Sequence, residues 1–146
     1  MKAAALAIDH GTRRTGFAAS DPLRIATRPL EVWEGAGDGD ELVEHVAEIA
    51  LEREVGTLVV GLPMNMDGSE GPRAAQVRAF VRRLRARLPL IAIALQDERL
   101  STKVAEELQR EARVPITKRR ALRDSWSALV ILRDWIEGGE RVDEVD

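Results

Sequence analysis

The stretch from Leu6 to Ala19 constrains the fold of this chain more than any other. An apolar run of strand length, Ala3 to Ile8, ends at Asp9, and a second apolar run follows Gly16. Polar residues and two glycines separate the runs, which predicts two strands joined by a tight connection. Asp9 is then the first charge at the end of a buried strand. Because a buried carboxylate is costly without a partner, Asp9 either caps the hairpin or binds a basic side chain or a cation.

The composition predicts one soluble domain. The chain has 146 residues, enough for a sizeable core, and 45% of them are apolar. There is no cysteine, which excludes disulfide frameworks and thiolate chemistry. No apolar run approaches the roughly 20 residues that span a bilayer, and the start lacks a secretory signal. We expect a cytoplasmic protein without membrane contact, with a single domain over residues 1–138 and an acidic tail over 139–146 that is a candidate for disorder.

Basic residues are concentrated in two segments, although the net charge is only −3. The first segment, residues 73–87, belongs to an arginine-rich helix whose cations are expected to form a solvated face. The second segment, residues 113–120, is expected to be a basic loop that contains Lys118, Arg119 and Arg120. The two histidines, His10 and His45, are not spaced as a pair of metal ligands.

The hydrophobic pattern predicts an α/β fold. We expect strands at residues 3–8, 15–20, 27–33, 57–61 and 90–95, and helices at 41–54, 73–88, 103–112 and from 122 or 124 to 137. Pro29 restricts the third strand to an edge or an irregular start, because proline lacks the backbone donor. Three early strands can form an antiparallel meander, whereas the later strand–helix–strand units require parallel pairing. The result is a mixed five-stranded sheet, three antiparallel strands and then two parallel ones, flanked by helices.

Three acids lie where such a sheet would bring them together. Asp9 and Glu98 follow parallel strands, whose carboxyl ends form the edge at which open sheets bind ligands. Asp124 is expected to point inward from the first turn of the last helix. Strand alternation does not choose between Glu98 and its neighbour Asp97. Asp124 could also be an ordinary acid at a helix N-terminus, where the helix dipole favours it.

Three converging carboxylates either take up protons or bind divalent cations. Ligation by oxygen alone suits Mg²⁺ or Mn²⁺, which keep waters and phosphate oxygens in their remaining positions. Two such ions can activate a water and stabilise the leaving oxygen of a phosphodiester. The basic segment 113–120 directly precedes Asp124, so it could hold a nucleic-acid backbone beside the metal ions.

Four motifs in a fixed order carry a family resemblance that covers nearly the whole chain. They are Asp9-x-Gly11-x-x-Arg14-x-Gly16, Gly61-Leu62-Pro63 with Asp67-Gly68-Ser69, Asp97-Glu98-Arg99-Leu100-Ser101-Thr102, and Asp124-Ser125-x-Ser127-Ala128. With these motifs the chain resembles the RuvX/YqgF family of the ribonuclease H-like superfamily, which is related to the RuvC Holliday-junction resolvases. Ser101 stands where the family more often has threonine and Ser127 where alanine is usual, and neither difference removes a carboxylate.

The resemblance implies a ribonuclease H-like fold and a divalent-metal-dependent endonuclease. It implies Asp9, Glu98 and Asp124 as the catalytic acids that bind Mg²⁺ or Mn²⁺, and it favours Glu98 over Asp97. Asp9 would bridge two ions, and the other two acids would complete one site each. The phosphates would be bound by four basic residues, Arg14, Lys118, Arg119 and Arg120.

The family has two assigned roles, resolving four-way DNA junctions and trimming the 5′ end of the 16S rRNA precursor, and the sequence does not choose between them. A resolvase makes two symmetrical cuts, so a homodimer would fit that role. Two other hypotheses compete with the nuclease. One is a phosphotransferase of the actin and sugar-kinase type, which also begins with Asp-x-Gly-Thr but needs two such domains. The other is a nucleic-acid-binding module without catalysis, against which the three acids argue.

Overall fold

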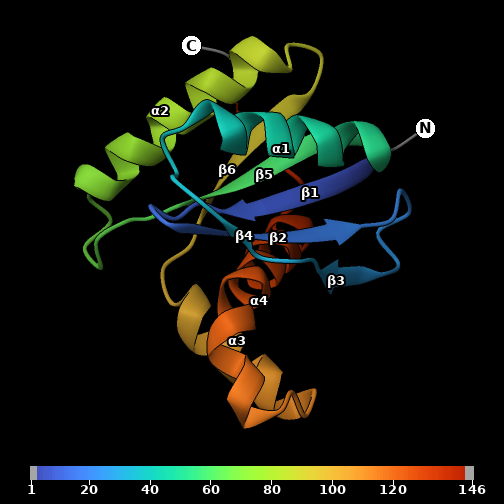
Figure 1. The fold of residues 1–146 in the computed structure, drawn as a ribbon, viewed down its shortest axis with the longest axis vertical. Coiled ribbons are helices and arrows are strands. Elements are labelled where there is room, and N and C mark those ends of the chain that lie inside the picture. Colours follow the sequence, from blue (N-terminus) through green and yellow to red (C-terminus); the bar gives the residue numbers. More distant parts are fainter. Residues whose placement is uncertain (1–2, 144–146) are drawn as a thin grey trace.

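The computed structural model describes residues 3–143 and has a mixed sheet at its centre (Figure 1). Its strands are β1 (Ala4–Asp9), β2 (Arg14–Ser20), β3 (Thr27–Pro29), β4 (Trp33–Glu34), β5 (Val55–Leu62) and β6 (Ala92–Asp97). The main path runs β3-β2-β1-β5-β6, and β4 pairs with the start of β2 beside it. β1, β2 and β3 are antiparallel neighbours, while β1, β5 and β6 run parallel. The predicted mixed sheet is confirmed.

Helices cover both faces of the sheet. They are α1 (Asp40–Glu52), α2 (Pro72–Arg87), α3 (Ser101–Glu111) and α4 (Ile116–Glu137). Figure 1 shows α1 and α2 on one face and α4 on the other, with α3 beside the first turns of α4 and away from the sheet. No helix within residues 3–143 is long and apolar enough to cross a membrane.

The two faces of β1 differ in the size of their side chains. Leu6 and Ile8 belong to the core under α1 and α2, whereas Ala5 and Ala7 belong to the core under α4. This alternation follows from the period of two along a strand. Because alanines occupy the α4 side, the helix axis can lie close to the strands. That close approach brings residues of α4 to the sheet near Asp9.

The predicted third strand is wrong in its extent. It was expected over residues 27–33, but β3 ends at Pro29 and pairing resumes only in the two-residue β4. Proline cannot donate to the ladder, so the chain leaves the regular pairing there, although Leu30 N still donates to Phe17 O at 2.8 Å. The sheet therefore has a sixth short strand that the sequence pattern did not reveal.

The predicted start of the last helix is also wrong. It was expected at Leu122 or Asp124 after a basic loop, but α4 begins at Ile116, directly after Pro115. The extended backbone of Pro115 suits the residue before a helix, and Lys118 N donates to its carbonyl at 2.8 Å. Most of the basic segment is therefore helical, and Asp124 lies inside α4 rather than in its first turn.

Buried polar contacts fix α3 against the first turns of α4. Gln109 is buried, and its Nε2 donates to Arg119 O at 3.0 Å. Arg119 Nε in turn donates to Val114 O at 2.8 Å. These bonds hold the start of α4 against α3 and fix the direction of the Arg119 side chain.

The segment after α4 folds back onto the domain. Glu140 pairs with Arg24 at 3.1 Å, and Trp135 Nε1 donates to Arg141 O at 2.7 Å. These contacts place residues 140 and 141 against the body of the domain. The last three residues of the expected acidic tail, 144–146, lie outside the described residues.

Ser125→Ala should lower the free energy of unfolding by about 1–3 kcal/mol, the cost of an unsatisfied buried donor. Ser125 is fully buried on α4, and its Oγ accepts a bond from Phe17 N of β2 at 3.1 Å. Urea unfolding measures the loss. The control is Ser127→Ala, the same change at a similarly buried position where alanine is usual in the family resembled. Equal losses in the two variants would contradict this role of Ser125.

Candidate active site

Three elements bring the predicted acids to one edge of the sheet. Asp9 is the last residue of β1, Glu98 directly follows β6, and Asp124 lies on α4 where the helix crosses β2. The side chains of Asp9 and Glu98 are hydrogen-bonded to each other. Since β1 and β6 run parallel on either side of β5, both acids leave the sheet at its carboxyl edge.

Burial raises the pKa of Asp9 well above its ordinary value, and the nearby charges of Glu98 and Asp124 raise it further. Burial also raises the pKa of Glu98. A hydrogen bond between two carboxyl groups needs a proton on one of them, and the raised pKa values favour that proton. Asp9 and Glu98 therefore form one interacting acidic pair, whose burial opposes ionisation of both carboxyl groups.

Asp124 lies beside this pair but has a different partner. Its Oδ2 is 3.5 Å from Arg14 Nε. That oxygen is buried and, among the described residues, has no hydrogen-bond partner. A buried acceptor without a partner is rare in folded proteins and calls for a physical explanation.

Glycine makes the approach of Asp124 possible. Gly16 lies on β2 opposite Asp9, and a Cβ placed there would be 2.0 Å from the backbone oxygen of Asp124. The backbone of α4 therefore rests directly on the strand at this point. Gly61 of β5 also lies close to Glu98, because a Cβ there would be 2.8 Å from Glu98 Oε2. Both glycines belong to the motifs singled out in the sequence.

The donor chemistry of this cluster fits a divalent cation. Asp9, Glu98 and Asp124 offer carboxylate oxygens only, the ligand type that Mg²⁺ and Mn²⁺ prefer. The unpartnered Oδ2 of Asp124 is the observation that supports the fit. Within residues 3–143, no three acidic or histidine side chains are already arranged to hold a metal ion. Asp9 and Glu98 bond each other and Asp124 pairs with Arg14, so binding of an ion by all three requires their side chains to turn.

Asp97 does not join the cluster. Although burial opposes it, hydrogen bonds from the side chain and backbone of Arg99 hold the pKa of Asp97 below its usual value. The Arg99 guanidinium lies 2.7 Å from Asp97 Oδ2 and also bonds Met66 O at 3.1 Å. Asp97 thus ties the end of β6 to the loop before α2, while Glu98 bonds Asp9.

The four predicted phosphate ligands are not brought together. Arg14 starts β2 and lies beside Asp124, whereas the other three lie on the first turns of α4. Lys118 and Arg120 are exposed there, and Arg119 is partly buried by its bond to Val114. Arg120 precedes Asp124 by four residues, so the two lie on the same side of the helix.

Sequence reasoning missed Arg73, at the start of α2. Its Nη2 donates to His10 O at 2.6 Å, and its charge lowers the pKa of both Asp9 and Glu98, against the larger effect of burial. The arginines of this helix were expected to form a solvated face. The available signal was position, because a helix that follows a parallel strand begins at the same edge as the carboxyl end of that strand.

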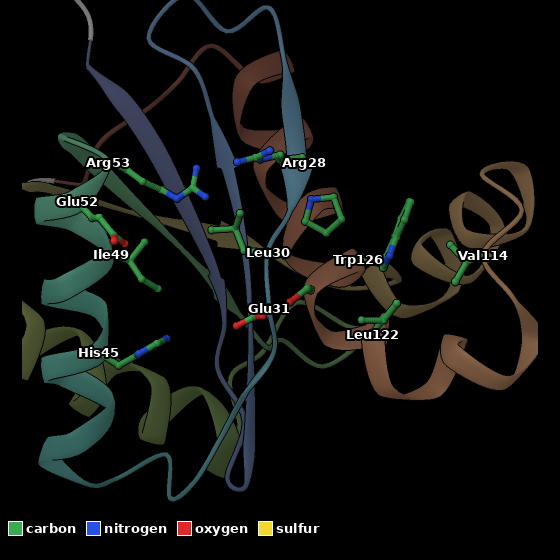
Figure 2. A pocket seen from close by; sticks show the side chains of 12 residues that line it. Arg28, Leu30, Glu31, His45, Ile49, Glu52, Arg53, Val114, Leu122 and Trp126 are labelled. Carbon is green, nitrogen blue, oxygen red and sulfur yellow. The ribbon is translucent and has the colours of Figure 1, made fainter.

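A separate groove of about 660 Å³ lies on the β3 side of the sheet (Figure 2). It opens between α1, β3 and the first half of α4, and its lining includes His45, Trp126 and Arg28. His45 stacks with Trp33 at a ring distance of 5.9 Å. None of the three clustered acids lines this groove, so it is distinct from the acidic site.

Comparison with known proteins points to one family. The family described as RuvX, Holliday junction resolvase, matches residues 3–138. A relative from Halalkalibacterium halodurans is 38% identical over 90% of this chain and 94% of its own length. One from Rhodopseudomonas palustris is 43% identical over 90% of this chain and 81% of its own length. Both are named "Putative pre-16S rRNA nuclease".

Solved structures share the fold. RuvC from T. thermophilus in complex with a Holliday junction substrate has a TM-score of 0.61 at 13% identity, covering 98% of this chain and 99% of that one. The Fowlpox virus resolvase with Holliday junction DNA has a TM-score of 0.53 at 8% identity, covering 91% and 98%. At these identities the likeness establishes the RuvC-like, ribonuclease H-type fold alone. The sequence match, in contrast, extends over nearly the whole chain, and the chain therefore belongs to the RuvX family.

Proposed function

We propose that this protein is a divalent-metal-dependent endonuclease that hydrolyses phosphodiesters in structured nucleic acid. The observation that carries the proposal is the cluster of Asp9, Glu98 and Asp124, in which three separate elements converge and one buried oxygen has an ion pair but no hydrogen bond. Family membership supports the proposal, since relatives are named as nucleases. The proposal includes the cytoplasmic location expected from the sequence.

The three acids, Asp9, Glu98 and Asp124, would hold the metal ions. Bound there, Mg²⁺ or Mn²⁺ would supply an activated water and stabilise the leaving oxygen. The chain itself positions the acids. Gly16 lets α4 reach the sheet, and the bond from Phe17 N to Ser125 fixes the helix beside Asp124.

Lys118, Arg119 and Arg120 would bind phosphates along the substrate, with Arg120 nearest the acids. Arg14, which lies 3.5 Å from Asp124, would bind a phosphate beside the acids. Contacts of this kind position a nucleic acid without reading its sequence. Recognition by charge and shape suits both proposed substrates, a four-way DNA junction and the precursor of 16S rRNA. A homodimer belongs to the proposal only for the junction, whose two cuts are symmetrical.

The test incubates the protein with Mn²⁺ or Mg²⁺ and either a four-way DNA junction or a 16S precursor RNA, with Asp9→Asn as the control. Paired symmetrical nicks in the junction, absent with the variant, would identify a resolvase. Trimming of the RNA alone, equally absent with the variant, would identify an rRNA maturation nuclease. Metal-independent binding with no product from either substrate would refute the proposal and favour a binding module.

Replacing Lys118 and Arg120 together by glutamine should weaken binding to the preferred nucleic acid and flatten its salt dependence. Each lost phosphate contact reduces the magnitude of the slope of log K against log salt by about 1, so the slope of the double variant should be smaller in magnitude by about 2. The matched control is the double change Arg82→Gln and Arg85→Gln, which removes equal charge from α2. Equal slopes for the two double variants would show that α4 is not part of the surface that binds nucleic acid.

A further inference from the structure

Arg73 is anchored to the residue that follows Asp9. Its Nη2 donates to the backbone oxygen of His10 at 2.6 Å and lies 3.3 Å from His10 Nδ1. Its other terminal nitrogen, Nη1, donates to Gln76 on the same helix. The guanidinium is therefore fixed from two sides, at the point where β1 leaves the sheet.

The geometry fixes the tautomer of His10. Its Nε2 lies 2.8 Å from Gly37 O, and a carbonyl oxygen can only accept, so Nε2 carries the proton. Nδ1 of the neutral ring then accepts the bond from Arg73. The imidazole is thus a neutral link between the backbone at Gly37 and the Arg73 guanidinium.

The link is rigid. The His10 ring is buried and packs at a tilt of 33° against Phe80 of α2, at a centroid distance of 4.5 Å. At Gly37 a Cβ would be 2.1 Å from Gly11 O and 2.9 Å from His10 Nε2. Only a glycine therefore allows the backbone at residue 37 to lie this close to Gly11 and to the His10 ring. A side chain held by packing and by hydrogen bonds loses little further entropy when it binds a ligand. Packing and hydrogen bonds of this kind are typical of a side chain that is held in one orientation to bind a ligand.

Arg73 also lies at the strand end that carries Asp9. Its Nη2 bonds the backbone oxygen of the residue that follows Asp9, so the guanidinium lies at the end of β1, on the α2 side. Its charge acts on Asp9 and Glu98 from there. Arg14 lies on another side, against Asp124. A guanidinium has five N–H donors, and it binds phosphate oxygens through two parallel bonds more often than a lysine does. It can therefore bond an anion while it stays anchored to His10.

We propose that Arg73, held in place by His10, donates hydrogen bonds to a non-bridging oxygen of the phosphate that is cleaved. This inference rests on the proposed nuclease function and deepens it. In this role Arg73 only donates hydrogen bonds and transfers no proton. Its role is to bind the negative phosphate at a place where three carboxylates would otherwise repel it. The competing role is structural, in which Arg73 only offsets the charge of Asp9 and Glu98.

The experiment first maps the position at which the wild-type protein cuts its preferred substrate. That substrate is then made with a neutral methylphosphonate at the mapped position, and binding of both forms is measured in EDTA. The variants are Arg73→Gln, Arg73→Lys and the control Arg82→Gln, which removes an exposed charge from the same helix. The preference of Arg73→Gln for phosphate over methylphosphonate should be about tenfold weaker than that of the wild type. Arg82→Gln should match the wild type.

Cleavage under single-turnover conditions with Mn²⁺ gives the second measurement. At saturating protein, the rate of Arg73→Gln should be about 10²–10³-fold lower, as for the loss of one preorganised donor at a reacting group. Arg73→Lys should fall between the wild type and Arg73→Gln, because it keeps the charge but not the two parallel bonds. Thermal unfolding of each variant establishes that it is folded.

The outcomes separate this inference from the function on which it rests. If the wild type cuts and Arg73→Gln or Arg73→Lys, when folded, keeps the full phosphate preference, Arg73 is a structural counter-ion and the inference fails alone. If the wild type cuts neither the junction nor the precursor RNA, the nuclease proposal fails, and the inference fails with it.

Discussion

Asp9→Asn is expected to abolish cleavage and, at the same time, to stabilise the protein in the absence of metal ions. The loss of cleavage should be about 10³-fold or more, because a proposed metal ligand and its charge disappear. The gain in stability follows from the buried pair. Asparagine keeps the shape of the side chain and can donate to Glu98 without requiring a proton to be taken up.

The pH dependence of this gain has a definite sign. The folded-state pKa of Asp9 is raised, first by burial and then by Glu98, above the value of about 3.9 in the unfolded chain. The stabilisation that comes from the proton on Asp9 is therefore complete below about pH 4 and is lost as the pH rises through the raised folded-state pKa. The wild type should become less stable across that interval in EDTA, and Asp9→Asn should lose less stability over it.

Thermal unfolding in EDTA near pH 7.5 measures the difference. We expect Asp9→Asn to be more stable by about 1–3 kcal/mol, with a rise in Tm of about 2–4 °C per kcal/mol. Added Mn²⁺ should raise the Tm of the wild type and leave the variant almost unchanged, since ligands stabilise the state that binds them. Glu48→Gln, at an exposed carboxylate of α1, is the control. A variant that Mn²⁺ stabilises as strongly as the wild type would exclude Asp9 as a metal ligand.

The sheet could be predicted from the sequence because its signals are local. The alternation of alanine with larger residues from Ala4 to Ile8 defines both faces of β1. The start of α4 could not be predicted in the same way. Residues 116–120 are polar or exposed and carry no apolar stripe. This part of the helix is stabilised by a tertiary contact with Gln109 of α3, and such a contact produces no periodic pattern in the sequence.

The candidate site also has a part that the sequence predicts and a part that it does not. The positions of Asp9 and Glu98 at strand ends follow from the strand order, which the pattern of parallel and antiparallel units predicts. The choice of Glu98 over Asp97 depends on Arg99, whose guanidinium holds Asp97 away from the pair. The place of Arg73 depends on a tertiary contact with His10 O. The contact between Arg73 and His10 joins residues 63 apart in the sequence, so it leaves no periodic trace along the chain.

Gly16→Ala should be among the most destabilising single substitutions in this protein. A Cβ at Gly16 would lie 2.0 Å from the backbone oxygen of Asp124, 2.1 Å from its backbone carbon and 2.5 Å from Ser125 N. These atoms belong to the backbone of α4, which cannot turn aside as a flexible side chain can. The helix must move off β2, and it would break the bond between Phe17 N and Ser125 as it moves. Overpacking costs about 1–3 kcal/mol and occasionally more, so we expect about 3 kcal/mol or more.

Two further glycines make the measurement specific. Gly39→Ala is the matched control, because the nearest atom to its added Cβ is 3.6 Å away, an ordinary contact. At Gly61 the added Cβ would meet the ends of two side chains, Ile131 at 2.6 Å and Glu98 at 2.8 Å.

Gly61→Ala should therefore lose less stability than Gly16→Ala in urea unfolding, while it displaces Glu98 and slows cleavage. If Gly16→Ala is as stable as Gly39→Ala, the close packing of α4 on β2 is wrong. The route by which Asp124 reaches the other two acids would then be wrong as well, since it depends on the same contact.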